Sequence, residues 1–394
     1  MESIKNDKNK VNTKEEDELG ELASGILEIM VDGYGFLRPK NYTQESRDIY
    51  ISQSQIRRFN LKNGDEIVGH ARNSKNGERY NALMRVDLVN GQNPDQAKKR
   101  IAFEFLTPIY PNERVYLGKD NEQLSMRLID LISPIGKGQR GIIVAPPKAG
   151  KTTLLKDIAL SVSKNYPNIK IFILLIDERP EEVTDIKEAL DADNVEVIYS
   201  TFDEKSESHI KVAQTTLERA KRLTEQGYDT MILLDSLTRL TRANNLTVTP
   251  SGRTLSGGLD PASFYFPKRL FGAARNTREG GSLTILATAL IETGSRMDDM
   301  VYEEFKGTGN MELVLSRKLQ EKRIFPAIDV QKSGTRREDL LLSKHEYEAM
   351  QIIRKSLDQT TIEQATDSLL NMFEKTKDNE VLIKNILVST KHQK

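Results

Sequence analysis

The chain has 394 residues, 37% of them hydrophobic, which is enough for about two or three domains with apolar cores. It has no cysteine, which excludes disulfides, thiolate zinc sites and cysteine nucleophiles, and its four histidines are too scattered for a metal cluster. Lysine plus arginine and aspartate plus glutamate number 58 each, so any nucleic-acid binding must come from local basic sites.

The N-terminus is almost entirely polar and charged. Residues 1–22 therefore predict a disordered lead-in. They contain no apolar core of a signal sequence, and no window of about 18 apolar residues occurs in the chain. We expect a cytoplasmic protein that neither leaves the cell nor spans a membrane.

Residues 23–92 form the first expected domain. Short alternating runs such as GILEIM, DIYIS and DEIVGHAR, separated by turn residues, predict a small all-β barrel. In DGYGFLRP, Tyr34 and Phe36 share one face of a strand with Arg38 beside them, which favours stacking of nucleic-acid bases. Packing of both rings inside the barrel is the alternative. Arg57 and Arg58 in SQIRRFN suit phosphate contacts, and a solvated helix face explains them equally well.

A linker is expected over residues 93–135, and a second domain over residues 136–394. In the second domain apolar strands such as GIIVA, IFILLID, MILLD and SLTILATAL alternate with helical stretches. This pattern predicts a parallel α/β core.

The stretch VAPPKAGKTTLL, residues 144–155, joins a strand to a helix through a turn. Its Gly150, Lys151 and Thr152 match the P-loop spacing G-x-x-x-x-G-K-[ST], with Ala145 in place of the first glycine. The glycine lets a phosphate approach the backbone closely, the lysine reaches the β- and γ-phosphates, and the threonine hydroxyl suits Mg²⁺. The expected ATP contacts in this turn are Lys148, Ala149, Gly150, Lys151, Thr152 and Thr153.

Acidic residues follow two apolar strands. Asp235 comes directly after MILL, the usual position of a Walker B carboxylate that holds Mg²⁺; a strand-capping aspartate is the alternative. Asp177 and Glu178 end IFILLIDE, at the edge of the sheet where ligands collect. We expect Glu178 to be the general base that activates water, against the alternative of a solvated acidic loop, and the adjacent Arg179 to contact ATP.

Several long motifs occur in a fixed order: APPKAGKTTLL, LLIDERPEEVTD, ILLDSLTRLTRANN, FGAARN, GTGNMEL and FPAIDVQKSGTRREDLL. Over about residues 25–370 the chain resembles the transcription termination factor Rho family of hexameric, ATP-dependent RNA translocases. The resemblance implies an α/β RecA-like P-loop motor domain preceded by an OB-fold barrel, in a homohexamer that threads RNA. It also implies two further partners, the RNA polymerase elongation complex and the elongation factor NusG.

The resemblance assigns further roles in the barrel. It implies a primary site for single-stranded, pyrimidine-rich RNA, in which acidic side chains accept hydrogen bonds from the cytosine amino group. The matching positions are Tyr34, Phe36, Arg38, Asp48, Tyr50, Glu78 and Tyr80.

Two loops of the second domain carry single cations. The segment TVTPSGRTLSGGLDP, residues 247–261, is glycine-rich and contains Arg253, and ETGSRMDDM contains Arg296. By resemblance these are secondary-site loops that grip RNA phosphate, where the family commonly has lysine at both positions. Ordinary surface loops are the alternative.

Near the C-terminus, SGTRRED contains Arg336 and Arg337 outside any apolar run. A lone basic pair is usually solvated, but by resemblance Arg336 matches the arginine finger that enters the nucleotide site of a neighbouring subunit. In EKRIFP, Arg323 is a candidate phosphate contact, and by resemblance Phe325 lies against the adenine; core packing is its alternative.

Three functions fit these patterns. The first is an RNA-driven hexameric ATPase that terminates transcription. The second is the catalytic subunit of a rotary ATPase, which also joins a β-barrel to a P-loop core but lacks RNA-stacking aromatic residues. The third is a non-catalytic RNA-binding regulator, which the presence of Lys151, Thr152, Glu178 and Asp235 disfavours. A small helical domain, which many members of the family carry before the barrel, is expected to be absent.

Overall fold

A computed structural model describes residues 20–42, 48–75, 77–118, 123–357 and 360–391. The chain forms two compact units. The barrel unit comprises the residues up to 106 together with 211–226, and the sheet unit comprises 107–210 and the residues from 227 onward. The disordered lead-in expected for residues 1–22 lies, up to residue 19, outside the described residues.

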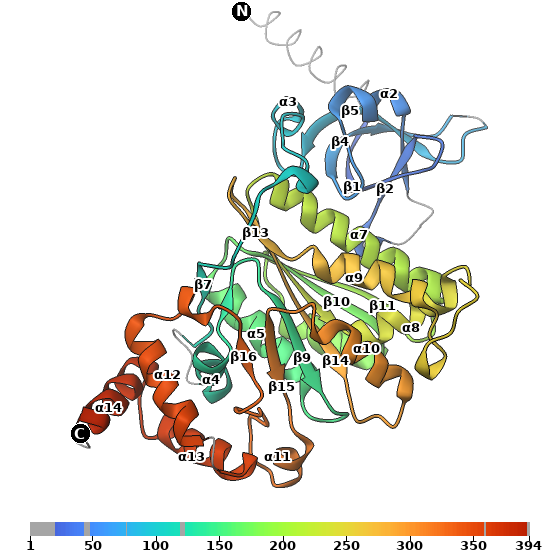
Figure 1. Ribbon diagram of the computed structural model, residues 1–394. Helices are drawn as coiled ribbons and strands as arrows, with labels where there is room; N and C mark the ends of the chain where they lie inside the picture. Colours follow the sequence, from blue (N-terminus) through green and yellow to red (C-terminus); the bar gives the residue numbers. More distant parts are fainter. Residues whose placement is uncertain (1–19, 43–47, 76, 119–122, 358–359, 392–394) are drawn as a thin grey trace, which may run out of the picture. The chain divides into compact units, whose positions relative to one another are not determined.

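The barrel unit is built on short strands that close on themselves in the order β1-β2-β3-β5-β4 (Figure 1), which confirms the OB-like barrel. The strands are β1 (Glu21–Ile29), β2 (Gly35–Arg38), β3 (Ile49–Ile51), β4 (Glu66–Arg72) and β5 (Asn81–Val89). Short helices accompany them: η1 (Lys40–Tyr42), α2 (Gln53–Phe59), α3 (Pro94–Ala97) and η2 (Phe103–Phe105).

Alternation of side chains builds the barrel core. In β4, Ile67, Gly69 and Ala71 are buried, and the residues between them are partly exposed. Ile67 packs in one cluster with Leu27 of β1 and Ile51 of β3. The apolar pattern therefore fixes which face of each strand turns inward.

The C-terminal part of helix α7 (Ser206–Glu225) belongs to the barrel unit. Buried Glu225 accepts the backbone N–H of Phe103 at 2.8 Å and lies 2.9 Å from the guanidinium of Arg100. Arg100 also donates to both carboxylate oxygens of Asp65, at 2.7 and 2.6 Å. Three distant stretches of chain thus share one buried network of charges.

The sheet unit contains a sheet in the order β11-β10-β12-β14-β9-β15-β16 (Figure 1), and β13 pairs with β14 on one side and with β6 on the other. All pairs from β11 to β15 are parallel, which confirms the parallel α/β core. β7 and β8 pair separately. The strands are β6 (Pro108–Ile109), β7 (Arg114–Val115), β8 (Ile135–Gly136), β9 (Arg140–Ala145), β10 (Lys170–Glu178), β11 (Val195–Thr201), β12 (Asp229–Asp235), β13 (Arg275–Thr277), β14 (Ser282–Leu290), β15 (Met311–Val314) and β16 (Gly334–Thr335).

Helices connect and cover the strands of the sheet. None of the helices among the described residues is long and apolar enough to cross a membrane. They are α4 (Leu124–Ile132), α5 (Lys151–Asn165), α6 (Pro180–Ala189), α8 (Leu237–Thr247), η3 (Ser256–Gly258), η4 (Pro261–Phe264), α9 (Tyr265–Gly272), α10 (Arg296–Lys306), α11 (Arg317–Glu321), η5 (Glu338–Leu340), α12 (Lys344–Leu357), α13 (Ile362–Glu374) and α14 (Asn379–Lys391).

The core of the sheet unit joins strands to helices. Ile173 of β10 and Leu233 of β12 pack in one cluster with Ile158 of α5. Helix α4, which falls within the stretch expected to be a linker, contributes Leu128 and Leu131 to the same cluster. Packing of this kind holds the ends of β9, β10 and β12 in fixed positions, and the polar side chains considered next lie at those ends.

Candidate active site and nucleic-acid interface

The turn between β9 and α5 has the geometry of an anion-binding loop. Lys148 has φ 65° and Gly150 has φ 87°, the second a conformation that favours glycine. No side chain caps α5 at Gly150, so its first N–H groups point into the turn without a side-chain acceptor. Such N–H groups and the positive end of a helix dipole favour phosphate. Of the other expected contacts, Ala149 is buried and Thr153 is exposed.

Four of the expected site residues meet at the end of this turn. Glu178 ends β10 and Asp235 ends the adjacent parallel strand β12. The Nζ atom of Lys151 lies 2.6 Å from Oδ2 of Asp235 and 3.0 Å from Oε1 of Glu178. Thr152 Oγ1 donates to the same Asp235 oxygen at 3.2 Å. The site thus holds a lysine, a hydroxyl and two carboxylates within one hydrogen-bonded cluster.

Burial controls the chemistry of Glu178, which is 1% exposed. Burial, followed by the charge of Asp235, raises the pKa of Glu178 above its usual range, although Lys151 and Arg239 oppose the shift. The Arg239 guanidinium lies 3.4 Å from Oε2 of Glu178. Arg239 is not among the residues that the sequence predicts for this site. Its only signal was its place four residues after Asp235, in the first turn of the helix that follows the strand.

Local backbone geometry separates Glu178 from its acidic neighbour. The pairing of β10 with β11 is interrupted by a bulge between Ile176 and Glu178, and Asp177 is the extra residue. Asp177 has φ 58°, and its side chain is 41% exposed. The two adjacent acids therefore have different surroundings, and only Glu178 contacts Lys151.

The remaining expected nucleotide residues lie elsewhere on the surface of the sheet unit. Arg336, Arg323 and Arg179 have exposed side chains, and Phe325 is 52% exposed. Among the described residues none of the four contacts the Lys151 cluster. Arg336 follows β16, and its backbone N–H donates to the carbonyl of Asn310 at 2.8 Å.

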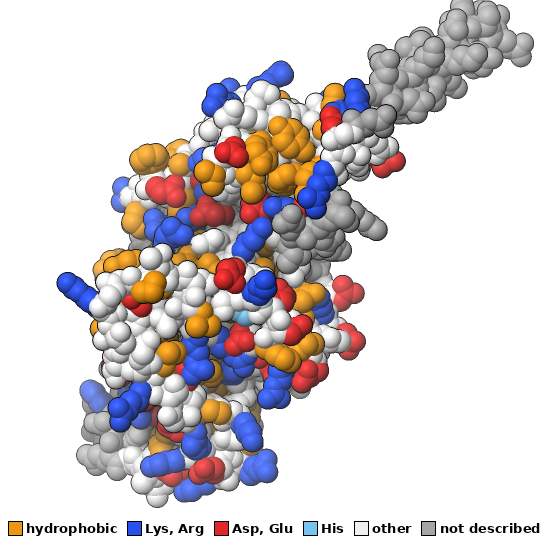
Figure 2. Space-filling model, turned by 90° about the vertical axis from the view of Figure 1, so that its right-hand side faces the viewer, with side chains coloured by type: hydrophobic (Ala, Val, Ile, Leu, Met, Phe, Trp, Pro, Cys, Tyr) orange, Lys and Arg blue, Asp and Glu red, His pale blue; other side chains and the backbone are white. Residues whose placement is uncertain are grey.

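Aromatic side chains form a continuous group on the barrel. The ring centroids of Tyr34 and Phe36 are 5.7 Å apart, those of Phe36 and Tyr80 4.8 Å, and those of Tyr34 and Tyr50 5.7 Å. All four rings are half-buried, so they present part of their surface to solvent rather than filling the core. Figure 2 shows hydrophobic side chains gathered on the surface of the barrel between acidic and basic ones. We call these four residues the aromatic platform.

The charged residues expected beside the platform are largely paired. Arg38 is 3% exposed, and its guanidinium binds Glu28 at 2.5 Å and also Asp48, which is buried with it. The same guanidinium lies 5.1 Å from the ring centroid of Phe36. The Arg38–Asp48 pair thus packs against the platform through the ring of Phe36. A buried charge needs an opposite charge or hydrogen bonds in place of its lost hydration, and this pairing supplies them; direct contact of Arg38 and Asp48 with RNA stays a prediction.

Glu78 and the arginine pair are more accessible. Glu78 is exposed and accepts two hydrogen bonds from Arg72, at 2.6 and 2.8 Å. These bonds and the backbone N–H of Lys75 lower the pKa of Glu78 to about 2, so the carboxylate stays charged. Arg57 and Arg58 lie in the last turn of α2 with exposed side chains.

The two loops expected to grip RNA lie side by side in the sheet unit. Arg253 is exposed in the first loop, and Arg296 is exposed at the first position of α10. Gly257 of the first loop packs against the backbone of Met297, where an added Cβ would come within 2.6 Å of the Met297 nitrogen. The glycine therefore permits the close approach that brings the two loops together.

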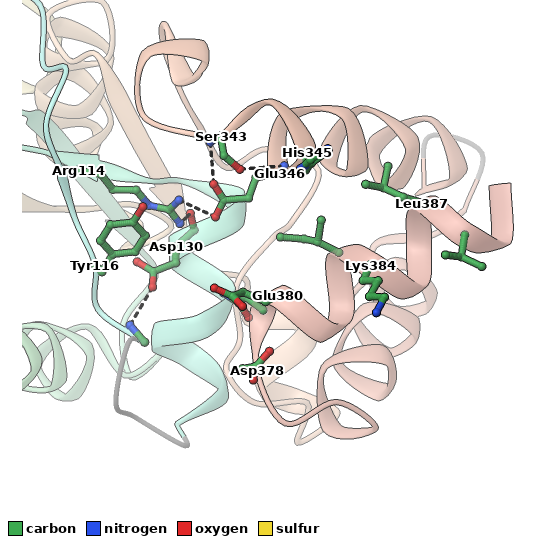
Figure 3. Close-up of a pocket in the computed structure, with 14 residues that line it drawn as sticks. Arg114, Tyr116, Asp130, Ser343, His345, Glu346, Asp378, Glu380, Lys384 and Leu387 are labelled. Carbon is green, nitrogen blue, oxygen red and sulfur yellow. Dashed lines mark hydrogen bonds and ion pairs between the residues drawn. The ribbon is translucent and has the colours of Figure 1, made fainter. Parts of the chain in front are cut away.

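A separate pocket of about 950 Å³ lies between the β7 region, α4, α12 and α14 (Figure 3). Arg114 donates to Glu346 at 2.8 Å and to the carbonyl of Asp130 at 2.6 Å. The Asp130 carboxylate accepts the N–H groups of Leu117 and Gly118, at 3.0 and 2.8 Å. The polar groups inside the pocket are thus largely hydrogen-bonded to one another. A pocket of this size does not by itself mark the nucleotide site.

Asp130 is expected to make the stability of the protein depend on pH. Burial raises the pKa of Asp130 from 3.8 to about 6, against the charge of Arg114 and the two N–H groups. Since its folded pKa is the higher one, Asp130 contributes stability in full below its unfolded pKa and loses it as the pH rises through about 6. We expect the stability of wild type relative to Asp130→Asn to fall by about 1 kcal/mol between pH 5 and pH 8. Thermal unfolding of both proteins at pH 5 and at pH 8 measures this difference in stability. The same difference at the two pH values would contradict the prediction.

Comparisons with known proteins match both units. Residues 23–95 match the family model of the Rho termination factor, RNA-binding domain, and residues 125–335 match that of the ATP synthase alpha/beta family, nucleotide-binding domain. The chain is 56% identical over 372 residues to the transcription termination factor Rho of Bacillus subtilis, covering 94% of this chain and 86% of the relative. It is 55% identical to that of Thermotoga maritima, covering 93% of this chain and 85% of the relative.

Solved structures show the same fold at low identity. An ATPase from the type III secretion system of pathogenic bacteria superposes with a TM-score of 0.58 at 24% identity, over 71% of this chain and 86% of that one. An ATP synthase subunit, NeqB from Nanoarchaeum equitans, gives 0.57 at 21% identity, over 72% of this chain and 77% of that one. These likenesses confirm a RecA-like ATPase fold for the sheet unit.

Proposed function

Because the chain belongs to the transcription termination factor Rho family, we propose that it binds single-stranded RNA, hydrolyses ATP and uses this hydrolysis to release transcripts from RNA polymerase. The observation that carries the proposal is the presence in one chain of the aromatic platform and of the cluster of Lys151, Thr152, Glu178 and Asp235.

ATP binds in the turn before α5. The backbone N–H groups of Gly150 to Thr153 and the ammonium of Lys151 hold its phosphates. Thr152 Oγ1 and Asp235 Oδ2, 3.2 Å apart, fit Mg²⁺, which takes one or two protein oxygens together with phosphate oxygens. When bound, the ion neutralises charge that develops on the transferred phosphoryl group.

Glu178 is the general base of hydrolysis. Its raised pKa makes it a stronger base than an exposed glutamate, and its position at the end of β10 places it beside the phosphate-binding turn. It orients the attacking water and accepts its proton. The water attacks the γ-phosphorus as the bond to the ADP oxygen breaks.

Arg336 completes the site from a neighbouring subunit. Its side chain is exposed and stands apart from the Lys151 cluster of its own chain, as an arginine finger acting across an interface requires. The functional assembly is a homohexamer, in which Phe325 lies against the adenine and Arg323 and Arg179 contact phosphate.

RNA binds at two places. The aromatic platform stacks pyrimidine bases, with Glu78 beside it as an acceptor for the cytosine amino group. Arg253 and Arg296 hold the RNA phosphates during translocation. The protein acts in the cytoplasm on the RNA polymerase elongation complex, with the elongation factor NusG as a further partner.

Stimulation of ATP hydrolysis by RNA tests the function. We expect poly(C) to raise the ATPase rate of the purified protein, and the protein with ATP to release transcripts from stalled polymerase. An ATPase rate that is the same with and without RNA would favour a rotary-type ATPase subunit. RNA binding without any turnover of ATP would favour a non-catalytic regulator.

Removing one ring of the platform tests the RNA site. Phe36→Ala is expected to weaken binding of cytosine-rich single-stranded RNA by about 5- to 150-fold, because stacking contributes about 1–3 kcal/mol per base. Leu22→Ala, at an exposed apolar position on β1 of the same barrel, is the matched control and should bind normally. Fluorescence anisotropy with labelled RNA measures both. Equal affinities of the two variants would mean that Phe36 does not contact RNA.

A further inference from the structure

Residues 251–260 form a closed turn in the loop that contains Arg253. Ser251 donates twice to Oδ2 of Asp260, from its backbone N–H at 2.6 Å and from its hydroxyl at 2.9 Å. Within the turn, the backbone N–H of Leu255 donates to the carbonyl of Leu259 at 2.7 Å, and Leu259 is fully buried. The two ends of this glycine-rich segment are therefore held together by one carboxylate.

Asp260 is itself held in place by neighbouring elements. Its backbone N–H donates to Oδ1 of Asn245 on α8 at 2.8 Å, and Nδ2 of Asn245 donates to the carbonyl of Gly258 at 3.3 Å. The second carboxylate oxygen of Asp260, Oδ1, accepts the N–H of Ala262 at 2.8 Å and so caps the short helix η4. The N–H groups of Ala262 and Ser251 lower the pKa of Asp260, so its carboxylate is charged at neutral pH. Asp260 thus acts on the loop from a fixed position.

A chain of hydrogen bonds leads from Asp260 to the backbone of Arg253. The hydroxyl of Ser251 donates to Asp260 and accepts the backbone N–H of Arg253 at 3.3 Å. A serine hydroxyl has one donor and two acceptor positions, so it can serve both neighbours at once. The Arg253 side chain is exposed, and no carboxylate in the described part of the chain forms an ion pair with it. The backbone of Arg253 is therefore ordered, while its guanidinium stays available to a ligand.

We propose that Asp260 is a positioning residue for RNA binding, because it holds, through Ser251, the backbone from which Arg253 reaches an RNA phosphate. The inference rests on the proposed function, since it assumes that Arg253 binds RNA. An arginine on an ordered loop binds phosphate without the loss of backbone entropy that a freely moving loop would incur. Asp260 therefore acts on RNA only through Arg253, and this separates it from a residue that merely stabilises the fold.

The concentration of cytosine-rich RNA that half-activates ATP hydrolysis tests the inference. Asp260→Asn keeps an amide oxygen for the N–H of Ala262 but puts an NH₂ group in place of the oxygen that accepts from Ser251. We expect this variant to need about 5- to 30-fold more RNA, the factor that corresponds to ordering the backbone of one residue on binding. Its ATPase rate in saturating RNA should stay close to that of wild type.

A double-mutant cycle with Arg253→Gln tests the route of the effect. If Asp260 acts only through Arg253, then Asp260→Asn should raise the half-activating concentration in the wild-type background and leave it unchanged in the Arg253→Gln background. An equal rise in both backgrounds, or no rise in wild type, would overturn the inference. If Arg253→Gln alone is activated like wild type, the proposed RNA contact of Arg253 is wrong, and the inference fails with it.

Two serines of the same loop supply matched variants. Ser251→Ala removes the hydroxyl that links Asp260 to Arg253 and should also raise the half-activating concentration, whereas Ser251→Thr keeps a hydroxyl and should restore activation. Ser256 is exposed in η3, and its hydroxyl forms no hydrogen bond with any residue that the structure describes. Ser256→Ala should therefore be activated like wild type. A loss in Ser256→Ala equal to that in Ser251→Ala would mean that any change in the loop weakens activation, and it would contradict the role of Asp260.

Discussion

Arg336→Ala is expected to slow ATP hydrolysis by about 10³- to 10⁵-fold while the variant still binds ATP and RNA and forms rings. The reason is the position of the side chain, which is exposed beyond β16 and has no contact with the Lys151 cluster of its own chain among the described residues. In the proposed ring, an arginine placed there would act on a neighbour's nucleotide rather than on that of its own chain. Steady-state ATPase rates in saturating RNA measure the loss.

The adjacent Arg337 is the matched control. Its guanidinium is bound to Asp339 at 3.0 Å, so it is held within its own chain. Arg337→Ala should therefore hydrolyse ATP at close to the wild-type rate. A loss equal to that of Arg336→Ala would mean that the loop, rather than one side chain, is required.

Mixed rings test whether the finger acts between subunits. When Arg336→Ala subunits are mixed with Glu178→Gln subunits, some interfaces pair an intact Glu178 with an intact Arg336 from the neighbour. Those interfaces should recover activity. No recovery, with subunit exchange verified, would leave Arg336 as a solvated surface cation.

Glu178→Gln is expected to keep ATP binding and to lose hydrolysis by about 10²-fold or more, because the amide cannot accept a proton from water. Lys151→Ala, in contrast, should lose nucleotide binding or turnover, since it removes the cation that meets the phosphates. Single-turnover hydrolysis together with equilibrium ATP binding separates the two effects.

Asp177→Asn is the control for the base assignment. Asp177 neighbours Glu178 in sequence, but the bulge in β10 leaves it half-exposed and away from Lys151. Its replacement should change the rate of hydrolysis little. Normal turnover in Glu178→Gln would refute the base assignment, whatever the control shows.

The sequence was most informative where function depends on local chain geometry. The P-loop spacing specifies a strand, a turn and a helix within twelve residues, and these elements lie where expected around Gly150. Glu178 and Asp235 were found because parallel strands end at one edge of a sheet, so that acids following two apolar runs come together. Arg239 was missed because its contact with Glu178 depends on how α8 packs.

The sequence was least informative about pairing of charges. The alternation in DGYGFLR predicts that Tyr34, Phe36 and Arg38 share a face, but it cannot tell a solvated arginine from a buried one. The structure buries Arg38 because Glu28, ten residues earlier, and Asp48, ten residues later, both reach its guanidinium. Such a pairing depends on the registers of β1, β2 and the segment before β3, which no single motif encodes.

The buried network around Glu225 has a consequence for how this protein can change during evolution. Asp65, Arg100 and Glu225 belong to one physical unit, yet more than a hundred residues of the sheet unit are encoded between the second and the third. A gene fragment that ends at residue 106 would carry the strands of the barrel but leave Arg100 without one of its two carboxylates. Recombination that moved this fragment alone would therefore break the buried network, because the helix that supplies Glu225 is encoded within the sequence of the ATPase domain.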